Sequence, residues 1–251
     1  MSVLQRHQLV WLGAEGWQSV LARAWDAQAH SLLAHWQANQ LPLVVCRQRG
    51  PETAHTISLG LPAPLQWQRR KLALDVALQD IASVGSFPLL EQIALAPADA
   101  AQVQLLLAQT QALHVPLRVY GSYGWQQLTG LPCVRASSDL DLLIPVPNLE
   151  SAGSMARALQ GLRLACRVDG ELVFPGGWAI AWREFLQLMD GTVDRVLVKE
   201  RGGVQLMGMA ELQVRLAATR SAGMSHTQRQ APSASDTPTY AERAIPAASL
   251  A

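Results

Sequence analysis

The chain has 251 residues, of which 49% are hydrophobic and 16% are charged. This length and composition suit one large domain or two small ones with a real core, and they exclude a chain that is disordered throughout. Twenty basic residues against 19 acidic ones leave a formal net charge of +1, which excludes binding of nucleic acid or an anionic membrane through a general positive field.

The three cysteines, Cys46, Cys133 and Cys166, are far apart and form no C-x-x-C pair. They support neither a zinc site nor a disulfide framework, so a reduced cytoplasmic compartment is the simplest interpretation. The first ten residues lack the apolar run of a signal peptide, and no stretch approaches the ~20 apolar residues that would span a bilayer. We therefore expect a soluble, cytoplasmic protein with no membrane partner.

Residues 1–88 are expected to form a small α/β module. Apolar residues at helical spacing or in short runs mark its elements. In chain order these are helix 15–38 with a possible break near His30, strands 43–46 and 57–61 around a Gly50-Pro51 turn, and helix 69–82, which opens with Arg69-Arg70-Lys71.

Residues 89–220 are expected to form a larger α+β domain, a mixed sheet flanked by helices. The predicted elements are helix 98–113, strand 116–120, a helix from about 124, strand 140–144, helix 149–162 with Asn148 as N-cap, a hairpin over 164–174 turning at Asp169-Gly170, a strand and helix over 178–189, and a hairpin over 193–207. Residues 221–251 are rich in Ser, Thr, Ala, Pro and Gln without an apolar period, which predicts a disordered tail.

The motif Asp139-Leu140-Asp141 is the most informative part of the chain. In a strand its two carboxylates face the same side while Leu140 packs into the core. Adjacent carboxylates repel and raise each other's pKa, and a divalent cation such as Mg²⁺ removes that penalty. Taken alone, such a motif is more often a pair of solvated residues at the start of a strand.

An apolar strand that ends in Gly121-Ser122 precedes this motif. Glycine permits close approach of the backbone to a phosphate, amides at a helix N-terminus point toward an anion, and the Ser122 hydroxyl can donate a further hydrogen bond. Gly-Ser alone is a common turn. A strand, Gly-Ser, a helix and then an apolar strand with two aspartates form a much more specific pattern.

This pattern resembles the nucleotidyltransferase superfamily of the DNA polymerase β type. The resemblance implies a nucleotidyltransferase fold and a third acid on a later strand, within residues 168–171. Asp169 fits the apolar-acid pattern, whereas an Asp-Gly hairpin turn would leave Glu171 as the strand-borne ligand, so both are candidates. Sixteen residues separate Ser122 from Asp139, a longer spacer than most members of that superfamily have.

A narrower resemblance covers most of residues 5–210. It is similar to the phosphoribosyl-dephospho-coenzyme A transferases of malonate decarboxylase, which act as holo-acyl-carrier-protein synthases. The matching segments are 6–12 (RHQLVWL), 42–45 (PLVV), 121–130, 138–143 (SDLDLL), 169–175 (DGELVFP) and 181–184 (AWRE). The W-Q-x-L-T-G stretch from Trp125 to Gly130 is the discriminating piece, because it occupies the long spacer.

The resemblance implies a donor, an acceptor and a metal. The donor would be 2′-(5″-triphosphoribosyl)-3′-dephospho-coenzyme A, and the acceptor a serine of the acyl carrier protein subunit of malonate decarboxylase. Asp139 and Asp141 would bind Mg²⁺. Asp169 or Glu171 would complete a second metal site or take the serine proton. Gly121 and Ser122 would anchor the leaving pyrophosphate.

Several further residues have both a functional and a structural interpretation. Arg135, Arg183 and Lys199 are candidate partners of the triphosphate, although Arg and Lys are more often simply solvated surface charges. Arg69-Arg70-Lys71 could meet phosphate or an acidic carrier protein, or could simply open a solvated helix. Trp125 could stack on adenine or ribose, or pack in the core. The six histidines form no ligand-spaced cluster and are expected to be structural or exposed.

Two other functions remain open at this point. The same core could transfer a nucleotidyl group to another small molecule or protein. A degenerate nucleotide-binding module would be a non-enzymatic alternative, although the intact carboxylates argue against it.

Overall fold

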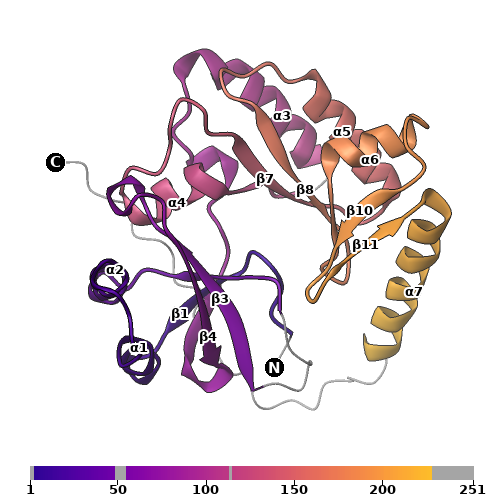
Figure 1. Cartoon of the computed structure of the whole chain (residues 1–251). Helices are drawn as coiled ribbons and strands as arrows, with labels where there is room; N and C mark the ends of the chain where they lie inside the picture. The colour runs from indigo at the N-terminus through magenta and orange to yellow at the C-terminus, as the bar shows by residue number, and fades with distance from the viewer. Residues whose placement is uncertain (1–2, 49–54, 113–114, 228–251) are drawn as a thin grey trace, which may run out of the picture.

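The computed structural model describes residues 3–48, 55–112 and 115–227, which form two β-sheets with their helices (Figure 1). The first sheet is antiparallel, with strand order β4-β3-β2-β1-β5. Its strands are β1 (Leu9–Leu12), β2 (Leu43–Val45), β3 (Thr56–Pro62), β4 (Lys71–Ala77) and β5 (Ile81–Gly85). The helices α1 (Ala14–Leu21) and α2 (Ala27–Ala38) follow β1 along the chain.

The region 69–82 is not the helix that its apolar residues predict. It forms strand β4, a short 3-10 turn and strand β5. Leu72, Leu74 and Val76 are buried, while the residues between them point outward. Leu72 and Val76 are four residues apart, a spacing that suits a helix turn and also a strand face, and Leu74 decides for the strand.

The other predictions for the first module hold with shifted bounds. Strands 43–46 and 57–61 are confirmed as β2 and β3. The predicted helix 15–38 is two helices, and the break lies over residues 22–26 rather than near His30. Asp26 causes this break as the N-cap of α2, because its side chain accepts a hydrogen bond from the backbone N–H of Ala29. The predicted Gly50-Pro51 turn lies outside the described residues.

The second sheet is mixed, with order β11-β10-β9-β8-β7-β6, and confirms an α+β fold. Only the β7–β8 pair is parallel among its described pairings. Its strands are β6 (Arg118–Tyr120), β7 (Leu140–Pro145), β8 (Val168–Val173), β9 (Ala179–Ala181), β10 (Val196–Lys199) and β11 (Val204–Met207). Helices α3 (Ala100–Ala112), α5 (Leu149–Gly161) and α6 (Trp182–Met189) lie together on one side of it (Figure 1).

Two further helices and four 3-10 turns complete the described chain. The helices are α4 (Gly121–Thr129) and α7 (Met209–Thr227), and the turns are Leu65–Trp67, Leu78–Asp80, Leu90–Gln92 and Pro97–Asp99. Asn148 caps α5 as predicted, since its Oδ1 accepts a 2.8 Å hydrogen bond from the Ser151 N–H. Helix α7 extends past residue 221, where a tail was expected to begin, and residues 228–251 lie outside the described part.

The predicted hairpin over 164–174 is wrong. Residues 168–173 form one continuous strand, β8, which runs parallel to β7 after the crossover helix α5. Gly170 is needed because the backbones of β7 and β8 approach each other closely there, and not because the chain turns. Its φ is +149°, and a Cβ atom there would lie 2.2 Å from the carbonyl oxygen of Leu142 on β7. The continuous strand places Asp169 opposite Asp141.

The two sheets are joined through shared packing and hydrogen bonds. The core of the first sheet includes Trp125 of α4 and Cys133, which come from the second half of the chain. Between the halves, the Gln48 N–H donates a 2.8 Å hydrogen bond to the carbonyl of Arg201. Within the described residues, no helix combines the length and the apolar character needed to cross a membrane.

Candidate active site

One row of side chains crosses three strands of the second sheet. Strand β7 buries Leu140, Leu142 and Ile144 in the core shared with the helices, so Asp141 points to the opposite face. The strand register pairs Asp141 with Tyr120 of β6 on one side and with Asp169 of β8 on the other. The aspartates of two different motifs are therefore neighbours on one face of the sheet.

The start of α4 presses directly against Asp141. Gly121 has φ +64°, and a Cβ atom on it would lie 1.9 Å from Oδ2 of Asp141. Only glycine leaves room for this carboxylate at the first turn of the helix. No side chain caps this turn, so its amides are available to an anion beside the aspartates. Ser122 lies in the same turn, as the predicted phosphate-binding pair requires.

Repulsion and burial dominate the electrostatics of Asp141. Burial, followed by the charges of Asp169 and Asp139, raises the pKa of Asp141 to about 6. Burial, followed by the charges of Glu171, Asp141 and Asp169, raises the pKa of Tyr120. The carboxylate of Asp141 therefore stands among like charges, and a cation beside it would be bound favourably.

Arg167 is a site residue that sequence analysis missed. Its Nε donates a 3.0 Å hydrogen bond to Oδ1 of Asp139, its Nη2 contacts Oδ2 of Asp139, and Nη2 also lies 3.4 Å from Oδ2 of Asp169. The hydrogen bond from Arg167 lowers the pKa of Asp139. Arg167 stands two residues before Asp169, a spacing that signals one shared face only once residues 167–173 are treated as extended.

Glu171 is held by three basic side chains from both halves of the molecule. It is only 3% exposed. Its Oε1 accepts a 2.8 Å hydrogen bond from Lys199 Nζ and a 3.4 Å one from Arg6 Nη2, and His7 Nε2 lies 3.3 Å from Oε2. Burial raises the pKa of Glu171, but His7, Arg6 and Lys199 outweigh it and hold the pKa well below its usual range.

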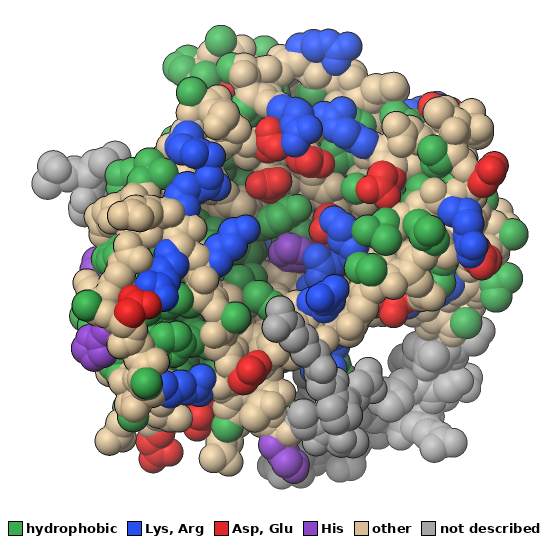
Figure 2. Space-filling model, in the orientation of Figure 1, with side chains coloured by type: hydrophobic (Ala, Val, Ile, Leu, Met, Phe, Trp, Pro, Cys, Tyr) green, Lys and Arg blue, Asp and Glu red, His purple; other side chains and the backbone are tan. Residues whose placement is uncertain are grey.

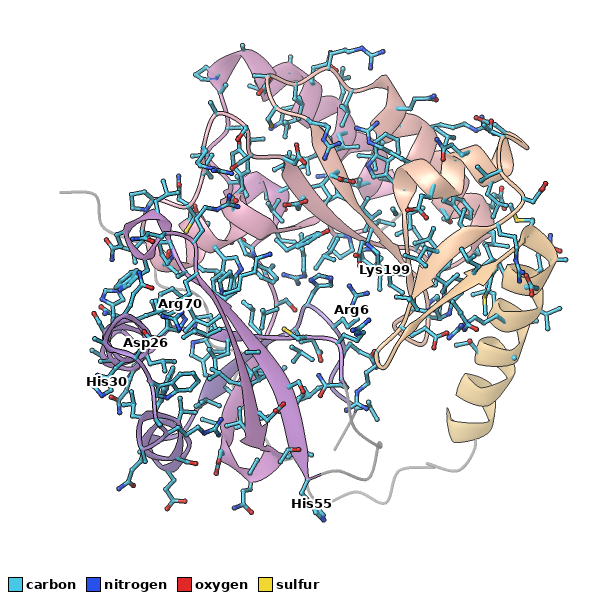
Figure 3. The ribbon with its side chains drawn as sticks, viewed as in Figure 1. Arg6, Asp26, His30, His55, Arg70 and Lys199 are labelled. Atoms are coloured by element: carbon cyan, nitrogen blue, oxygen red, sulfur yellow. The ribbon has the colours of Figure 1, made fainter. Side chains whose placement is uncertain are left out.

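Glu171 stands two residues after Asp169 on β8, and its charge also helps to raise the pKa of Asp141. Figure 3 shows Arg6 and Lys199 close together between the two sheets. Arg6 and His7 belong to the segment before β1, and no local signal in the sequence could connect them with Glu171. The histidines were expected to be structural or exposed, yet His7 lies at the site, with its ring centroid 4.6 Å from that of Tyr120.

The remaining predicted site residues are Arg183, Arg135 and Trp125, and they differ in position and exposure. Arg183 is near the acids: its Nη2 donates a 2.8 Å hydrogen bond to the Val168 carbonyl, and its charge contributes to the lowered pKa of Asp139. Arg135 is exposed in the turn that precedes Asp139. Trp125 is 5% exposed and packs against Phe87 and Trp36, with ring centroids 5.5 and 6.3 Å away. This burial favours the core alternative for Trp125 over stacking on a ligand.

Arg69-Arg70-Lys71 does not open a helix, because β4 begins at Lys71. Arg70 is engaged by Asp26, with 2.6 Å between Nη1 and Oδ1. Figure 3 shows Asp26, at the start of α2, and Arg70, just before β4, away from Arg6 and Lys199. This pairing favours the structural interpretation of Arg70.

The three aspartates fit Mg²⁺ by their chemistry and charge. Mg²⁺ prefers a few carboxylate oxygens, and the raised pKa of Asp141 shows how strongly a nearby positive charge would be stabilised. As the described side chains stand, no three His, Cys, Asp or Glu residues converge on one metal position, and Arg167 contacts both Asp139 and Asp169. Figure 2 shows a hollow between the two halves, with acidic side chains at one edge and basic ones on several sides.

Comparison with known proteins identifies the chain. Residues 5–87 match the phosphoribosyl-dephospho-CoA transferase MdcG N-terminal domain, and residues 88–210 match the MdcG C-terminal domain. The chain belongs to this family. The family match confirms the narrower resemblance and makes the chain a transferase. No solved structure matches it significantly.

Curated relatives support the MdcG assignment over most of the chain. A "phosphoribosyl-dephospho-CoA transferase" of Xanthomonas euvesicatoria pv. vesicatoria (strain 85-10) is 38% identical over 82% of this chain and 95% of its own length. Proteins with the same name from Bradyrhizobium diazoefficiens and Pseudomonas putida (strain W619) are 34% and 32% identical, over 78% and 82% of this chain and 90% and 95% of their own lengths.

Both MdcG domains supply side chains to the site. The C-terminal domain provides the acids and Arg167, whereas the N-terminal domain provides Arg6 and His7. The N-terminal domain therefore contributes two of the three basic side chains around Glu171.

Proposed function

We propose that this chain transfers the 2′-(5″-phosphoribosyl)-3′-dephospho-CoA group from its triphosphate donor to a serine of the malonate decarboxylase acyl carrier protein. The serine oxygen attacks the α-phosphorus, a new P–O bond forms, and the bond to the β-phosphate breaks so that pyrophosphate leaves. The observation that supports this most directly is the pairing of Asp141 with Asp169 beside the uncapped start of α4. The reaction would take place in the cytoplasm.

In this proposal Asp139 and Asp141 would hold Mg²⁺. The ion would neutralise charge that develops on the phosphate oxygens. Gly121 and Ser122 would bind the leaving pyrophosphate through the amides at the start of α4. Arg183, next to Asp139, and Lys199, next to Glu171, would add positive charge on the two sides of the acids.

We assign the third acidic role to Asp169. It stands opposite Asp141 in the parallel register and can either join the metal site or take the proton of the serine hydroxyl. Glu171 is a poor candidate for both tasks. Its pKa is lowered and three basic groups already bind it, so it is a weak base with little freedom to move.

The test combines the purified chain, Mg²⁺, the triphosphoribosyl donor and the apo carrier subunit, and follows carrier mass and pyrophosphate. Both should change together in a one-to-one ratio. Asp139→Asn and Asp141→Asn should each lower the rate by at least about a hundredfold, because they remove charge stabilisation in the transition state. Asp190→Asn, at an exposed aspartate at the end of α6, is the matched control and should leave the rate unchanged.

Two results would count against this function. Pyrophosphate release without a change in carrier mass would point to another acceptor. An authentic donor and carrier that yield neither product would refute the transfer reaction, and near-normal rates in both aspartate variants would refute the metal role.

A further inference from the structure

The basic side chains around Glu171 carry more positive charge than that residue needs. Arg6, His7 and Lys199 all converge on a single buried carboxylate. One ion pair would neutralise the charge of that carboxylate. Gathering surplus positive charge at a partly buried position has a desolvation cost, so the cluster suits a site that also receives an anion.

Among the described residues, the hydrogen bonds of Arg6 and Lys199 leave several of their N–H donors without an acceptor. Lys199 has three N–H donors and donates to Glu171; Arg6 has five, of which those on Nη2 contact Glu171 and His7. The side chains of Arg6 and Lys199 are 16% and 30% exposed. They are therefore partly open to solvent while Glu171 beneath them is buried.

The backbone before β1 is bent to deliver Arg6 and His7 to this place. His7 has φ +65°, a left-handed conformation that costs a non-glycine residue roughly 1 kcal/mol or more. Its N–H donates a 3.1 Å hydrogen bond to the Val45 carbonyl, and the Val45 N–H donates to the Gln8 carbonyl at 2.8 Å. Strand β2 thus fixes the bend.

The charge balance of the whole site also favours an anion beside Glu171. Asp139, Asp141, Asp169 and Glu171 carry four negative charges, and Arg6, Arg167, Arg183 and Lys199 carry four positive ones. One divalent cation at the aspartates would turn this balance into a positive excess. Beside Glu171, the two cations Arg6 and Lys199 face one carboxylate, so a positive charge is left there that can bind a polyanion.

We propose that Arg6 and Lys199 form a binding subsite for a polyphosphate group of the donor, with Glu171 as the positioning residue that holds both. This inference rests on the proposed function for the identity of the donor. The donor contains two such groups, the triphosphate and the internal diphosphate of dephospho-CoA. The subsite would make the N-terminal MdcG domain a direct contributor to donor binding.

Isothermal titration calorimetry on the full chain in excess Mg²⁺ tests the subsite with two probes, inorganic tripolyphosphate and dephospho-CoA. Arg6→Gln and Lys199→Gln should each weaken at least one probe by about tenfold or more, because each removes a charge-assisted hydrogen bond. The probe that loses affinity shows which phosphate group occupies the subsite. Both variants should also bind that probe with a smaller dependence on salt concentration.

Arg70→Gln is the matched control. It removes an arginine that pairs with a carboxylate in the same domain but away from the site, so both probes should bind as they do to the unchanged chain. Circular dichroism establishes that each variant is folded. Arg6→Gln removes a side chain that joins the two domains and could loosen their contact. In that case, the affinity of Lys199→Gln, at the end of β10, for the two probes tests the subsite.

The inference is overturned if folded variants at Arg6 and Lys199 both bind tripolyphosphate and dephospho-CoA within about twofold of the unchanged chain. The basic cluster would then serve only to join the two halves. This outcome is distinct from failure of the proposed function, because neither probe involves the carrier. If the unchanged chain modifies no carrier but the variants bind a probe more weakly, the subsite stands and the proposed acceptor is wrong.

Discussion

Asp141 lies at the point of greatest repulsion in the site. Burial and its acidic neighbours raise its pKa from 3.8 to about 6, so the folded state holds the proton of Asp141 more tightly than the unfolded state does. The stability that this proton contributes is present in full below about pH 4 and is lost as the pH rises through about 6. At neutral pH the metal-free protein therefore bears an unrelieved electrostatic cost.

Asp141→Asn should stabilise the metal-free protein above about pH 7. Asparagine has a similar shape without the charge, so in EDTA at about pH 8 the free energy of unfolding should rise by on the order of 2 kcal/mol. The gain should shrink toward zero near pH 4. Urea denaturation at several pH values measures this, with Asp190→Asn as the control. A variant that is less stable than the unchanged chain at pH 8 would contradict the electrostatic account.

Gly121 is a second position where a single atom decides the geometry of the site. Gly121→Ala should lower the transfer rate by at least about tenfold, because its Cβ would occupy the place of the Asp141 carboxylate. Gly130→Ala is a close control: Gly130 has φ +68°, but a Cβ there meets no atom within 4 Å. Both variants suffer backbone strain and only the first displaces Asp141. Equal rates in steady-state assays of the two variants would show that this contact is unimportant.

At the scale of elements, the predictions that held were those with local signals. Strand β7 follows from an apolar run closed by prolines, and α5 follows from Asn148 and the residues after it. The helix prediction for residues 69–82 failed because Leu72 and Val76 satisfy both a helical and an extended spacing. The hairpin at Asp169-Gly170 failed because glycine also serves where two strands approach closely, and the sequence does not distinguish these uses.

The same reasoning explains how much of the site could be predicted. Asp139, Asp141 and Gly121-Ser122 carry their pattern within short segments. Predicting Arg167 as a site residue required recognising β8 as one strand, and the choice between Asp169 and Glu171 required the register of that strand. Arg6 and His7 contact Glu171 across 165 and 164 residues of chain, a separation that no periodicity records.

Gly170 tests the parallel pair that brings the aspartates together. Gly170→Ala should lower the free energy of unfolding by about 2 to 3 kcal/mol, because the new methyl group must push β7 and β8 apart at the Leu142 carbonyl. Gly191→Ala has a positive φ of 69° but no atom within 4 Å of its Cβ, so its loss should be smaller. Chemical denaturation measures both. A loss no greater than that of Gly191→Ala would mean that the strand pair accommodates the methyl group.

On the scale of the whole molecule, the two MdcG domains are packed through one shared core region. Trp125 comes from the C-terminal domain but is buried among residues of the first sheet, beside Trp36 and Phe87. The short helix α4 thus has two functions at once. Its first turn lies against Asp141, and its Trp125 side chain fixes the helix to the other domain.

Trp125→Ala should therefore act on stability more than on donor binding. Removing the buried indole should lower the free energy of unfolding by about 3 to 5 kcal/mol, whereas Trp67→Ala, at a half-buried indole beside the same core, should cost less.

Trp125→Phe separates the structural role from a ligand contact. It retains an aromatic ring in the core, so its KM for the donor should stay close to that of the unchanged chain. Denaturation and steady-state kinetics on the same preparations measure the two effects. A Trp125→Phe protein of near-normal stability whose KM for the donor rises about tenfold would place the indole against the ligand instead. A large loss of stability in Trp125→Ala with an unchanged KM in Trp125→Phe would show that Trp125 acts as a core residue that holds α4 against the first domain.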